Sequence, residues 1–258
     1  MGMRRLGYLY RTIAKPLSFV LFGLGAVPIG LGVLPLLFLI VHPKSRFQRV
    51  GRRFVSLLMR LFSGFLILTG QISVKADRKA LSAYHGIIIA PNHPSLLDVV
   101  LLYGLLPGAS CVVRSGLGHS WVGAIINLLY IKNDDVPEEM LDAVKECIDM
   151  GDNVIIFPEG TRTKDARHLE IKRGVSYLAC ETNTPVLPVS ILGNDKRGLR
   201  KHDPIWQVNP DGRWHYQIEA HEPLLPSGRT RADSKTMQSA LAGILQKRLD
   251  EYDSEHLP

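Results

Sequence analysis

A stretch of 26 residues without a single charged side chain, residues 16–41, most constrains how this 258-residue chain can fold. At about 1.5 Å of rise per residue, a straight helix of that length exceeds the hydrocarbon core of a bilayer, which is roughly 30 Å thick. Residues at which helices bend interrupt the stretch: Gly23, Gly25, Pro28, Gly30, Gly32 and Pro35. The sequence therefore predicts a membrane-associated segment that bends near its middle.

Basic residues lie on both sides of this stretch. Residues 1–80 carry 13 Lys and Arg against one acid, whereas residues 81–258 carry 18 against 23. Basic flanks stay on the cytoplasmic side, so we expect a shallow hairpin or re-entrant pair on the cytoplasmic face of the cell membrane. A membrane-spanning segment and a monotopic segment that lies flat on the membrane are the alternatives. The cations accompany apolar segments and lack the interleaved aromatic residues of a base-stacking surface, so we expect membrane lipids as partners and no nucleic acid.

A second apolar stretch, residues 54–68, carries only Arg60 and is predicted to be an interfacial amphipathic helix. The alternative is that these N-terminal helices cover the core of a soluble protein. A cleaved signal peptide does not fit, because the first apolar stretch is far longer than the roughly 7–15 apolar residues of such a segment.

After residue 70 the pattern changes to short apolar runs separated by helical stretches. This change divides the chain into a membrane-associated segment, residues 1–70, and a domain over residues 71–258. Strands are predicted at 86–90, 111–113, 128–131, 154–157 and 186–192, and helices at 137–150, 171–181 and 233–252. Strands that alternate with helices indicate an α/β fold with a mostly parallel central sheet flanked by helices.

Several common catalytic motifs are absent from the sequence. It has no GxSxG, GxxxxGK[ST] or HExxH segment, so serine hydrolase, nucleotide hydrolase and zinc protease functions lose their usual support. The three cysteines are too scattered for a disulfide framework or a cysteine zinc site.

One polar cluster directly follows the first strand of the predicted domain. It contains Asn92, His93 and Ser95, with Asp98 five residues beyond the histidine. The carboxyl ends of parallel strands are where α/β proteins place their sites. A helix that begins near Ser95 would keep the imidazole neutral, and Asp98 could hold one ring nitrogen while the other accepts a proton. The alternative is that Asn92 and Ser95 merely cap a helix.

A second polar cluster follows the strand at 154–157. Glu159, Gly160, Thr161 and Arg162 place a carboxylate, a flexible glycine, a hydroxyl and a guanidinium in one turn. The glycine can bring its backbone N–H close to an anion, and the arginine offers a planar fork that matches phosphate. Lys172 extends this basic rim. The alternative is a solvated turn in which Glu159 and Arg162 pair with each other.

Together the two clusters, Asn-His-x4-Asp and Phe-Pro-Glu-Gly-Thr-Arg, resemble the glycerolipid acyltransferase family. Its best-known members are the 1-acyl-glycerol-3-phosphate acyltransferases, and residues 70–230 follow the family's order of elements. The resemblance implies a membrane-seated enzyme that transfers a fatty acyl chain to the hydroxyl of a lysophospholipid. It also implies acyl-CoA or acyl-carrier protein as the thioester donor, and no metal or redox cofactor.

The resemblance assigns roles to the matching residues. His93 is the general base that takes the proton of the acceptor hydroxyl, and Asp98 orients and charge-stabilises it. The expected substrate-binding residues are Asn92, Lys132, Glu159, Gly160, Thr161, Arg162 and Lys172. Lys132 stands where the family has an arginine that contacts the acceptor phosphate, and lysine loses the bidentate fork. Arg114 is an alternative anion contact.

Three alternatives to lysophosphatidate acylation remain open. The acceptor can be a different hydroxylated lipid from a specialised pathway, because Lys132 departs from the family pattern. The same site can also carry out hydrolysis or transacylation between lipids. The third alternative is a catalytically silent module that binds lipid or a carrier protein, although such a module has no need of a base.

Overall fold

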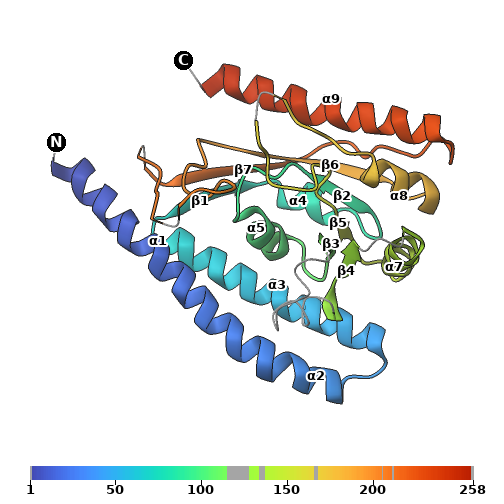
Figure 1. Ribbon diagram of the computed structural model, residues 1–258, viewed down its shortest axis with the longest axis horizontal. Helices are drawn as coiled ribbons and strands as arrows, with labels where there is room; N and C mark the ends of the chain where they lie inside the picture. Colours follow the sequence, from blue (N-terminus) through green and yellow to red (C-terminus); the bar gives the residue numbers. More distant parts are fainter. Residues whose placement is uncertain are drawn as a thin grey trace.

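The computed structural model describes residues 2–114, 128–133, 137–165, 168–204, 206–210 and 212–256. They form a seven-stranded sheet between two layers of helices (Figure 1). The strand order is β1-β7-β6-β2-β5-β3-β4, and β6 and β7 are the only neighbours among these strands that run antiparallel. This arrangement confirms the predicted α/β fold with a mostly parallel sheet.

The strands are β1 Ile72–Ala76, β2 Ile88–Pro91, β3 Ser110–Arg114, β4 Ile131–Asn133, β5 Val154–Ile155, β6 Val186–Leu192 and β7 Trp214–Ala220. The helices are α1 Gly2–Pro28, the π-helical segment η1 Ile29–Val33, α2 Leu34–Ile40, α3 Lys44–Leu68, α4 Arg78–Ser82, α5 Asp98–Leu105, α7 Pro137–Asp149, α8 Gly174–Thr182 and α9 Arg231–His256.

The predicted elements of the domain correspond to β2, β3, β5, β6, α7, α8 and α9. The strand expected at 128–131 is wrong except for its last residue, because residues 128–129 are helical and β4 begins at Ile131. β1 and β7 were not predicted. β1 is an edge strand of the sheet and β7 is its neighbour. β7 alternates between buried and more exposed residues, whereas every residue of β6 is buried.

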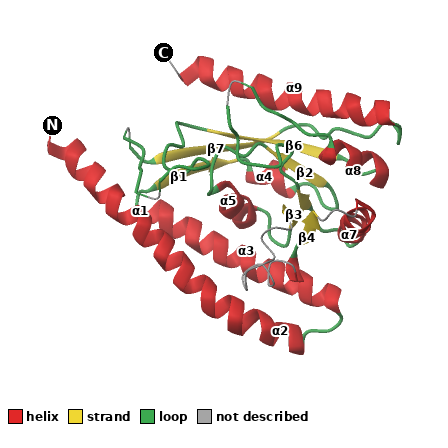
Figure 2. Cartoon of the chain, viewed as in Figure 1, coloured by secondary structure: helices red, strands yellow, loops and turns green. Residues whose placement is uncertain are grey.

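Helices cover both faces of the sheet (Figure 2). On one face, α7, α8 and α9 pack over a core that includes Ile88, Val186 and Leu241. On the other face, α3 and α5 pack over a core that includes Ile89, Leu102 and Trp214. Because alternate residues of β2 point to opposite faces, both layers contact the strand that leads into the candidate site.

The uncharged N-terminal stretch does not reverse near its middle. α1, η1 and α2 follow one another as helix, and the chain turns back only at residues 41–43, so α3 is the second arm of the hairpin (Figure 1). The π-helical segment η1 contains Gly30 and Gly32 and follows Pro28, so the α-helical hydrogen-bond pattern changes where these residues lie. The expected hairpin is therefore present, but its turn lies at the end of the apolar run.

The outer surface of this hairpin is strongly apolar. All but four of the exposed large hydrophobic side chains in the described part of the chain lie between Leu6 and Leu68. By length and composition, the 35-residue stretch Leu6–Ile40 can cross a membrane, and an 18-residue window within it has a mean hydropathy of 2.2. The predicted helix at 54–68 is the second half of α3, which packs one side against α5 and exposes apolar side chains on the other.

One lysine of α1 is buried against the domain. The Lys15 ammonium donates hydrogen bonds to the backbone carbonyls of Gly198 and Gln207, the latter at 2.7 Å. Both carbonyls belong to the connection between β6 and β7, residues 193–213, which we call the β6–β7 loop. The buried ammonium group of Lys15 therefore connects α1 of the apolar hairpin to this loop.

The crossing of α3 over α5 depends on a glycine. A Cβ atom at Gly104 of α5 would lie 3.2 Å from the Cα atom of Arg60 in α3. We expect Gly104→Leu to force the two helices apart and to lower the unfolding free energy by about 1–3 kcal/mol. The matched control is Gly243→Leu in α9, because a side chain there enters open space. Thermal unfolding in detergent measures both, and equal melting temperatures would contradict the prediction.

Candidate active site

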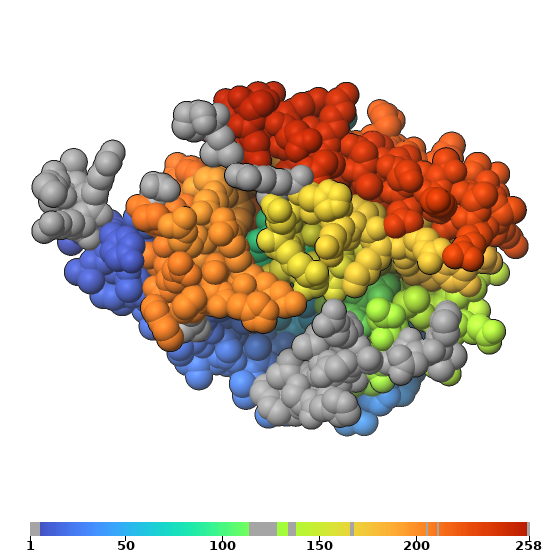
Figure 3. Space-filling view, turned by 45° about the horizontal axis from the view of Figure 1, so that its top comes forward, coloured from blue at the N-terminus to red at the C-terminus, as the bar shows by residue number. Residues whose placement is uncertain are grey.

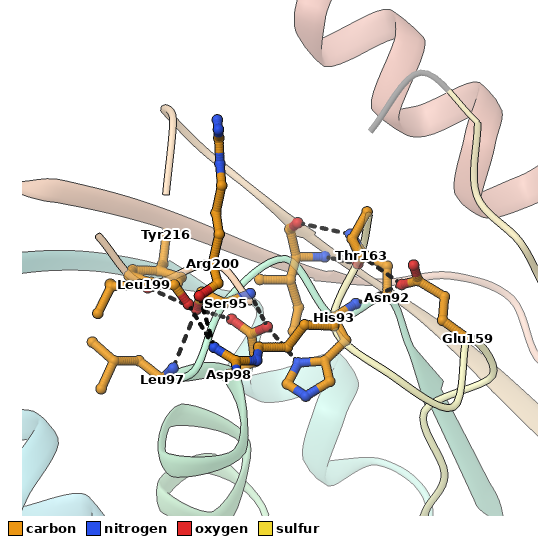
Figure 4. Close-up of polar contacts among 12 residues, drawn as sticks. Asn92, His93, Ser95, Leu97, Asp98, Glu159, Thr163, Leu199, Arg200 and Tyr216 are labelled. Carbon is orange, nitrogen blue, oxygen red and sulfur yellow. Dashed lines mark hydrogen bonds and ion pairs between the residues drawn. The ribbon is translucent and has the colours of Figure 1, made fainter. Parts of the chain in front are cut away.

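The end of β2 and the start of α5 bring His93 and Asp98 together (Figure 4). The Nδ1 atom of His93 lies 2.8 Å from Oδ2 of Asp98. Asp98 is fully buried, whereas the His93 side chain is 15% exposed. α5 begins at Asp98, three residues later than the expected start near Ser95, so the carboxylate sits at the first helical residue and faces back toward the turn.

This contact fixes which nitrogen of the imidazole is free. A carboxylate accepts hydrogen bonds, so the proton of a neutral His93 lies on Nδ1. Among the residues that the structure describes, none hydrogen-bonds to Nε2. The lone pair of Nε2 is therefore available to accept a proton from a substrate.

The turn after β5 holds the histidine from its other side. The ring of Phe157 stacks on the imidazole with a centroid distance of 4.0 Å. Oε1 of Glu159 accepts the backbone N–H of His93 at 2.9 Å, and the backbone N–H of Thr163 donates to the His93 carbonyl at 2.7 Å. Because β2 and β5 are neighbouring parallel strands, their carboxyl ends place the two polar clusters in contact.

The Glu159 side chain is buried and forms hydrogen bonds within the protein. Its carboxylate also accepts a hydrogen bond from the Thr163 hydroxyl at 2.8 Å. Burial raises the pKa of this carboxyl group, although the hydrogen bonds from Thr163 and His93 lower it. The expected contact of Glu159 with the acceptor's head group is not what the geometry favours, because its described hydrogen bonds hold the catalytic turn.

Asn92 and Gly160 are likewise engaged by the protein's own backbone. Both ends of the Asn92 amide bind Ile191 of β6, at 3.1 Å to its carbonyl and 2.6 Å from its N–H. The Gly160 N–H donates to the carbonyl of Phe157. Each of the two residues therefore helps to hold a turn of the site, and direct binding of substrate by either stays a prediction. Gly160 has a φ of +64°, a conformation that favours glycine.

Arg162 joins the second cluster to the β6–β7 loop. Its Nη1 atom donates to the carbonyls of Leu199 at 3.3 Å and Arg200 at 2.9 Å. Figure 3 shows the two segments side by side, in yellow and orange. One branch of the expected phosphate fork is thus occupied, while Nε and Nη2 have no hydrogen-bond partner among the described residues.

The other residues expected to bind the acceptor differ in their distance from the second polar cluster. The ammonium group of the exposed Lys172 lies beside Gly160, where a Cβ atom would be 3.1 Å from it, and Thr161 is half-buried in the same turn. Lys132 is exposed on β4, an edge strand that β5 and β3 separate from β2. No described contact joins Lys132 to the dyad, and the side chain of Arg114 lies outside the described part.

Asp98 has further partners that the sequence did not predict. The Ser95 N–H donates to Oδ2 at 2.7 Å, and the Ser95 hydroxyl donates to Oδ1 at 2.5 Å. The Tyr216 hydroxyl of β7 lies 2.9 Å from the Ser95 oxygen. The spacing of Ser95 and Asp98 was a signal for the first contact, because Ser and Asp bond locally at such turns. No sequence signal pointed to Tyr216, which lies 121 residues away from Ser95.

A buried cation completes the surroundings of the dyad. The Lys196 ammonium lies 4.4 Å from the centroid of the Tyr216 ring and donates to the carbonyls of Asn194 and His215. Burial lowers the pKa of Lys196 to about 8, against the opposing attraction of Asp98 and Asp195. Within the described ranges, no group of three His, Cys, Asp or Glu side chains is placed to hold a metal ion.

A His–Asp pair with a free ring nitrogen at the carboxyl edge of an α/β sheet is suited to general-base catalysis of acyl transfer. Residues 71–192 match the family model described as Acyltransferase. The chain is similar to two chloroplastic 1-acyl-sn-glycerol-3-phosphate acyltransferases: BAT2 of Brassica napus, 28% identical over 176 residues, and LPAT1 of Arabidopsis thaliana, 27% identical over 169 residues. These alignments cover 64% and 62% of the chain, which spans about half the length of either plant relative, at 50% and 47%.

Two bacterial proteins are similar over more of their length. A probable 1-acyl-sn-glycerol-3-phosphate acyltransferase of Mycoplasma pneumoniae is 25% identical over 211 residues, which cover 76% of this chain and 74% of that protein. The crystal structure of the 1-acyl-sn-glycerophosphate acyltransferase PlsC of Thermotoga maritima shares the fold, with a TM-score of 0.70 and 20% identity over 93% of this chain and 97% of that one. These similarities support the assignment of the chain to the glycerolipid acyltransferase family, a family of acyltransferase enzymes.

The raised pKa of Glu159 predicts a pH-dependent stability difference. A carboxyl group whose pKa is higher in the folded state stabilises the fold at low pH, and this contribution is lost as the pH rises through the folded pKa. Glu159→Gln keeps an oxygen that accepts the two hydrogen bonds but carries no charge. We therefore expect the variant's stability relative to the wild type to increase from about pH 4 upward and then level off. Denaturant unfolding across pH measures this, and a pH-independent difference would contradict it.

Proposed function

We propose that this protein acylates the free hydroxyl of a lysophospholipid, with lysophosphatidate as the first candidate. The observation that carries the proposal is the His93–Asp98 pair, which leaves the Nε2 atom of a partly exposed imidazole free at the carboxyl edge of the sheet. The 1-acyl-sn-glycerol-3-phosphate acyltransferases among its relatives support the acceptor. The donor is a fatty acyl thioester, either acyl-CoA or acyl-carrier protein.

The chemistry follows from the free nitrogen. Nε2 of His93 takes the proton of the acceptor hydroxyl while the oxygen attacks the thioester carbonyl, and the thiolate leaves when the tetrahedral intermediate collapses. The imidazolium then gives its proton to the departing sulfur. Asp98 stabilises the positive charge that develops on the ring and keeps Nε2 directed at the acceptor, as the aspartate does in a serine protease triad. The proposed reaction needs neither a covalent acyl-enzyme nor a metal ion.

The acceptor phosphate has cationic partners in the same turn. Arg162 retains two N–H-bearing nitrogens, Nε and Nη2, without described partners, and Lys172 lies beside Gly160 at the rim. A guanidinium that is anchored through Nη1 loses little freedom when it binds a phosphate, so it is well prepared for this task. We assign the phosphate to Arg162 and Lys172, and not to Lys132, which is exposed on the far edge of the sheet.

The N-terminal hairpin supplies the lipid surface. Exposed apolar side chains cover α1 and α2, and the exposed basic residues Lys44, Arg46 and Arg53 lie at the start of α3. An apolar surface that is bordered by cations binds the anionic face of a bilayer. We propose that residues 1–70 seat the enzyme on the cytoplasmic face of the membrane, while residues 71–258 carry out the transfer.

His93→Ala is expected to abolish acyl transfer, because it removes the only base within reach of the acceptor in the described site. The matched control is His85→Ala, an exposed histidine before β2, which should keep wild-type activity. The assay measures transfer from a labelled thioester to a panel of lysolipids in reconstituted vesicles. Normal turnover by the His93 variant would refute the mechanism.

The same panel separates the alternative functions. Product on lysophosphatidate supports the proposed acceptor, whereas product only on another hydroxylated lipid would replace it and keep the mechanism. Loss of thioester without any lipid acceptor would indicate hydrolysis. No turnover with either acyl-CoA or acyl-carrier protein would favour a lipid-binding module without catalytic activity.

Charges placed on the apolar hairpin should release the protein from membranes. Leu24 and Leu31 are 67% and 58% exposed, so we expect Leu24→Glu with Leu31→Glu to weaken binding to anionic vesicles by at least tenfold while the fold persists. Leu225→Glu is the control, since Leu225 is 72% exposed but lies outside the hairpin. Vesicle flotation measures binding, and equal binding of both variants would rule out this membrane surface.

A further inference from the structure

Tyr216 and Ser95 form a hydrogen-bonded chain that ends on the carboxylate of Asp98 (Figure 4). Ser95 and Asp98 are fully buried and Tyr216 is 2% exposed, so water does not replace these contacts. The serine comes from the turn after β2, while the tyrosine comes from β7, two strands away across the sheet. Neither residue belongs to the pairs that carry the proposed chemistry.

The direction of each hydrogen bond follows from the number of protons available. The Asp98 carboxylate accepts only, so the single hydroxyl proton of Ser95 is donated to Oδ1. The Ser95 oxygen is then left with lone pairs, one of which accepts the Leu97 N–H at 3.2 Å. The hydrogen bond between the two hydroxyl groups at 2.9 Å is therefore donated by Tyr216.

The electrostatic surroundings keep Tyr216 a donor. Burial and the negative charge of Asp98 raise its pKa well above the usual value, so the phenol stays protonated. The Lys196 ammonium lies against the face of its ring. A polarised phenol donates more strongly to Ser95, and Ser95 in turn donates more strongly to Asp98, because hydrogen bonds in a chain strengthen one another.

We propose that Ser95 and Tyr216 are positioning residues for acyl transfer, which hold the Asp98 carboxylate in the one orientation that keeps the proton of His93 on Nδ1. This inference rests on the proposed function for its kinetic consequence, but its structural consequence is independent of any substrate. The Ser95 hydroxyl holds Oδ1, and the Ser95 backbone N–H and the imidazole both donate to Oδ2. Without the Ser95 hydroxyl, Oδ1 loses its donor and only the contacts of Oδ2 restrain the carboxylate, so we expect the imidazole to sample the tautomer in which Nε2 carries the proton.

The kinetic test compares three variants in the vesicle assay. Tyr216→Phe keeps the ring and loses one hydroxyl, and we expect kcat to fall about tenfold while KM for both substrates stays within about twofold. Ser95→Ala should lower kcat further, by about 30–100-fold. Because Tyr216 acts through Ser95, the double variant should be no slower than Ser95→Ala alone. A wild-type kcat in Tyr216→Phe, or losses that add fully in the double variant, would overturn the proposal.

The control is Tyr103→Phe, which removes a buried hydroxyl from the same core without removing a hydrogen bond to Ser95 or Asp98. It should keep the wild-type kcat. If Tyr103→Phe and Tyr216→Phe lose activity and thermal stability to the same extent, general loosening of the core explains the effect and the positioning role is wrong.

A substrate-free measurement separates this proposal from the proposed function. In protein labelled with 15N-histidine at alkaline pH, the signals absent from His93→Ala identify the His93 ring. We expect a single tautomer with the proton on Nδ1 in the wild type and in Tyr103→Phe. The Nε2-protonated form should appear in Ser95→Ala and, to a smaller extent, in Tyr216→Phe. Unchanged tautomers in both would overturn the positioning role, whereas an inactive wild type with these tautomer changes would overturn only the acyltransferase function.

Discussion

The candidate site is organised around one buried negative charge. A carboxylate at zero exposure is costly unless hydrogen bonds replace the water that it loses, and Asp98 receives three, from His93 Nδ1 and from both the N–H and the hydroxyl of Ser95. These donors come from residues on the turn between β2 and α5, which explains why the helix begins at Asp98 rather than at Ser95. The cost of burying the charge is thus met by the same contacts that orient the base.

The sequence was sufficient to predict the class of fold and the location of the site. Continuous β-branched runs marked the central strands, and β6 has the predicted bounds, because a strand buried on both faces is almost continuously apolar. β1 and β7 were missed because their half-exposed residues mix polar and apolar types, and their pairing joins residues more than 130 positions apart. Their position in the sheet is decided by tertiary packing, which a local pattern does not contain.

The residues of the two motifs lie close together, and three of them contact the protein's own backbone, while their roles toward a substrate stay predictions. Glu159, Asn92 and Gly160 were expected to face a substrate, and the structure commits them to the backbone of His93, Ile191 and Phe157. A motif records which side chains a site requires without separating those that touch a ligand from those that hold the turn. The hydrogen-bond partners in the structure supply this information. In Arg162, for example, only the Nη1 atom of the guanidinium donates to the β6–β7 loop.

The position of β7 also determines when the site is completed during synthesis. The strand lies between β1 and β6 and donates Tyr216 to the dyad, yet it is followed by only one further helix of the described chain. A ribosome releases the apolar hairpin and the His93 turn long before residue 214, so β1 and β6 are synthesised before the strand that lies between them in the sheet. The base therefore acquires all its described supports only after β7 has been synthesised, and a product truncated before Trp214 lacks the strand that completes the site.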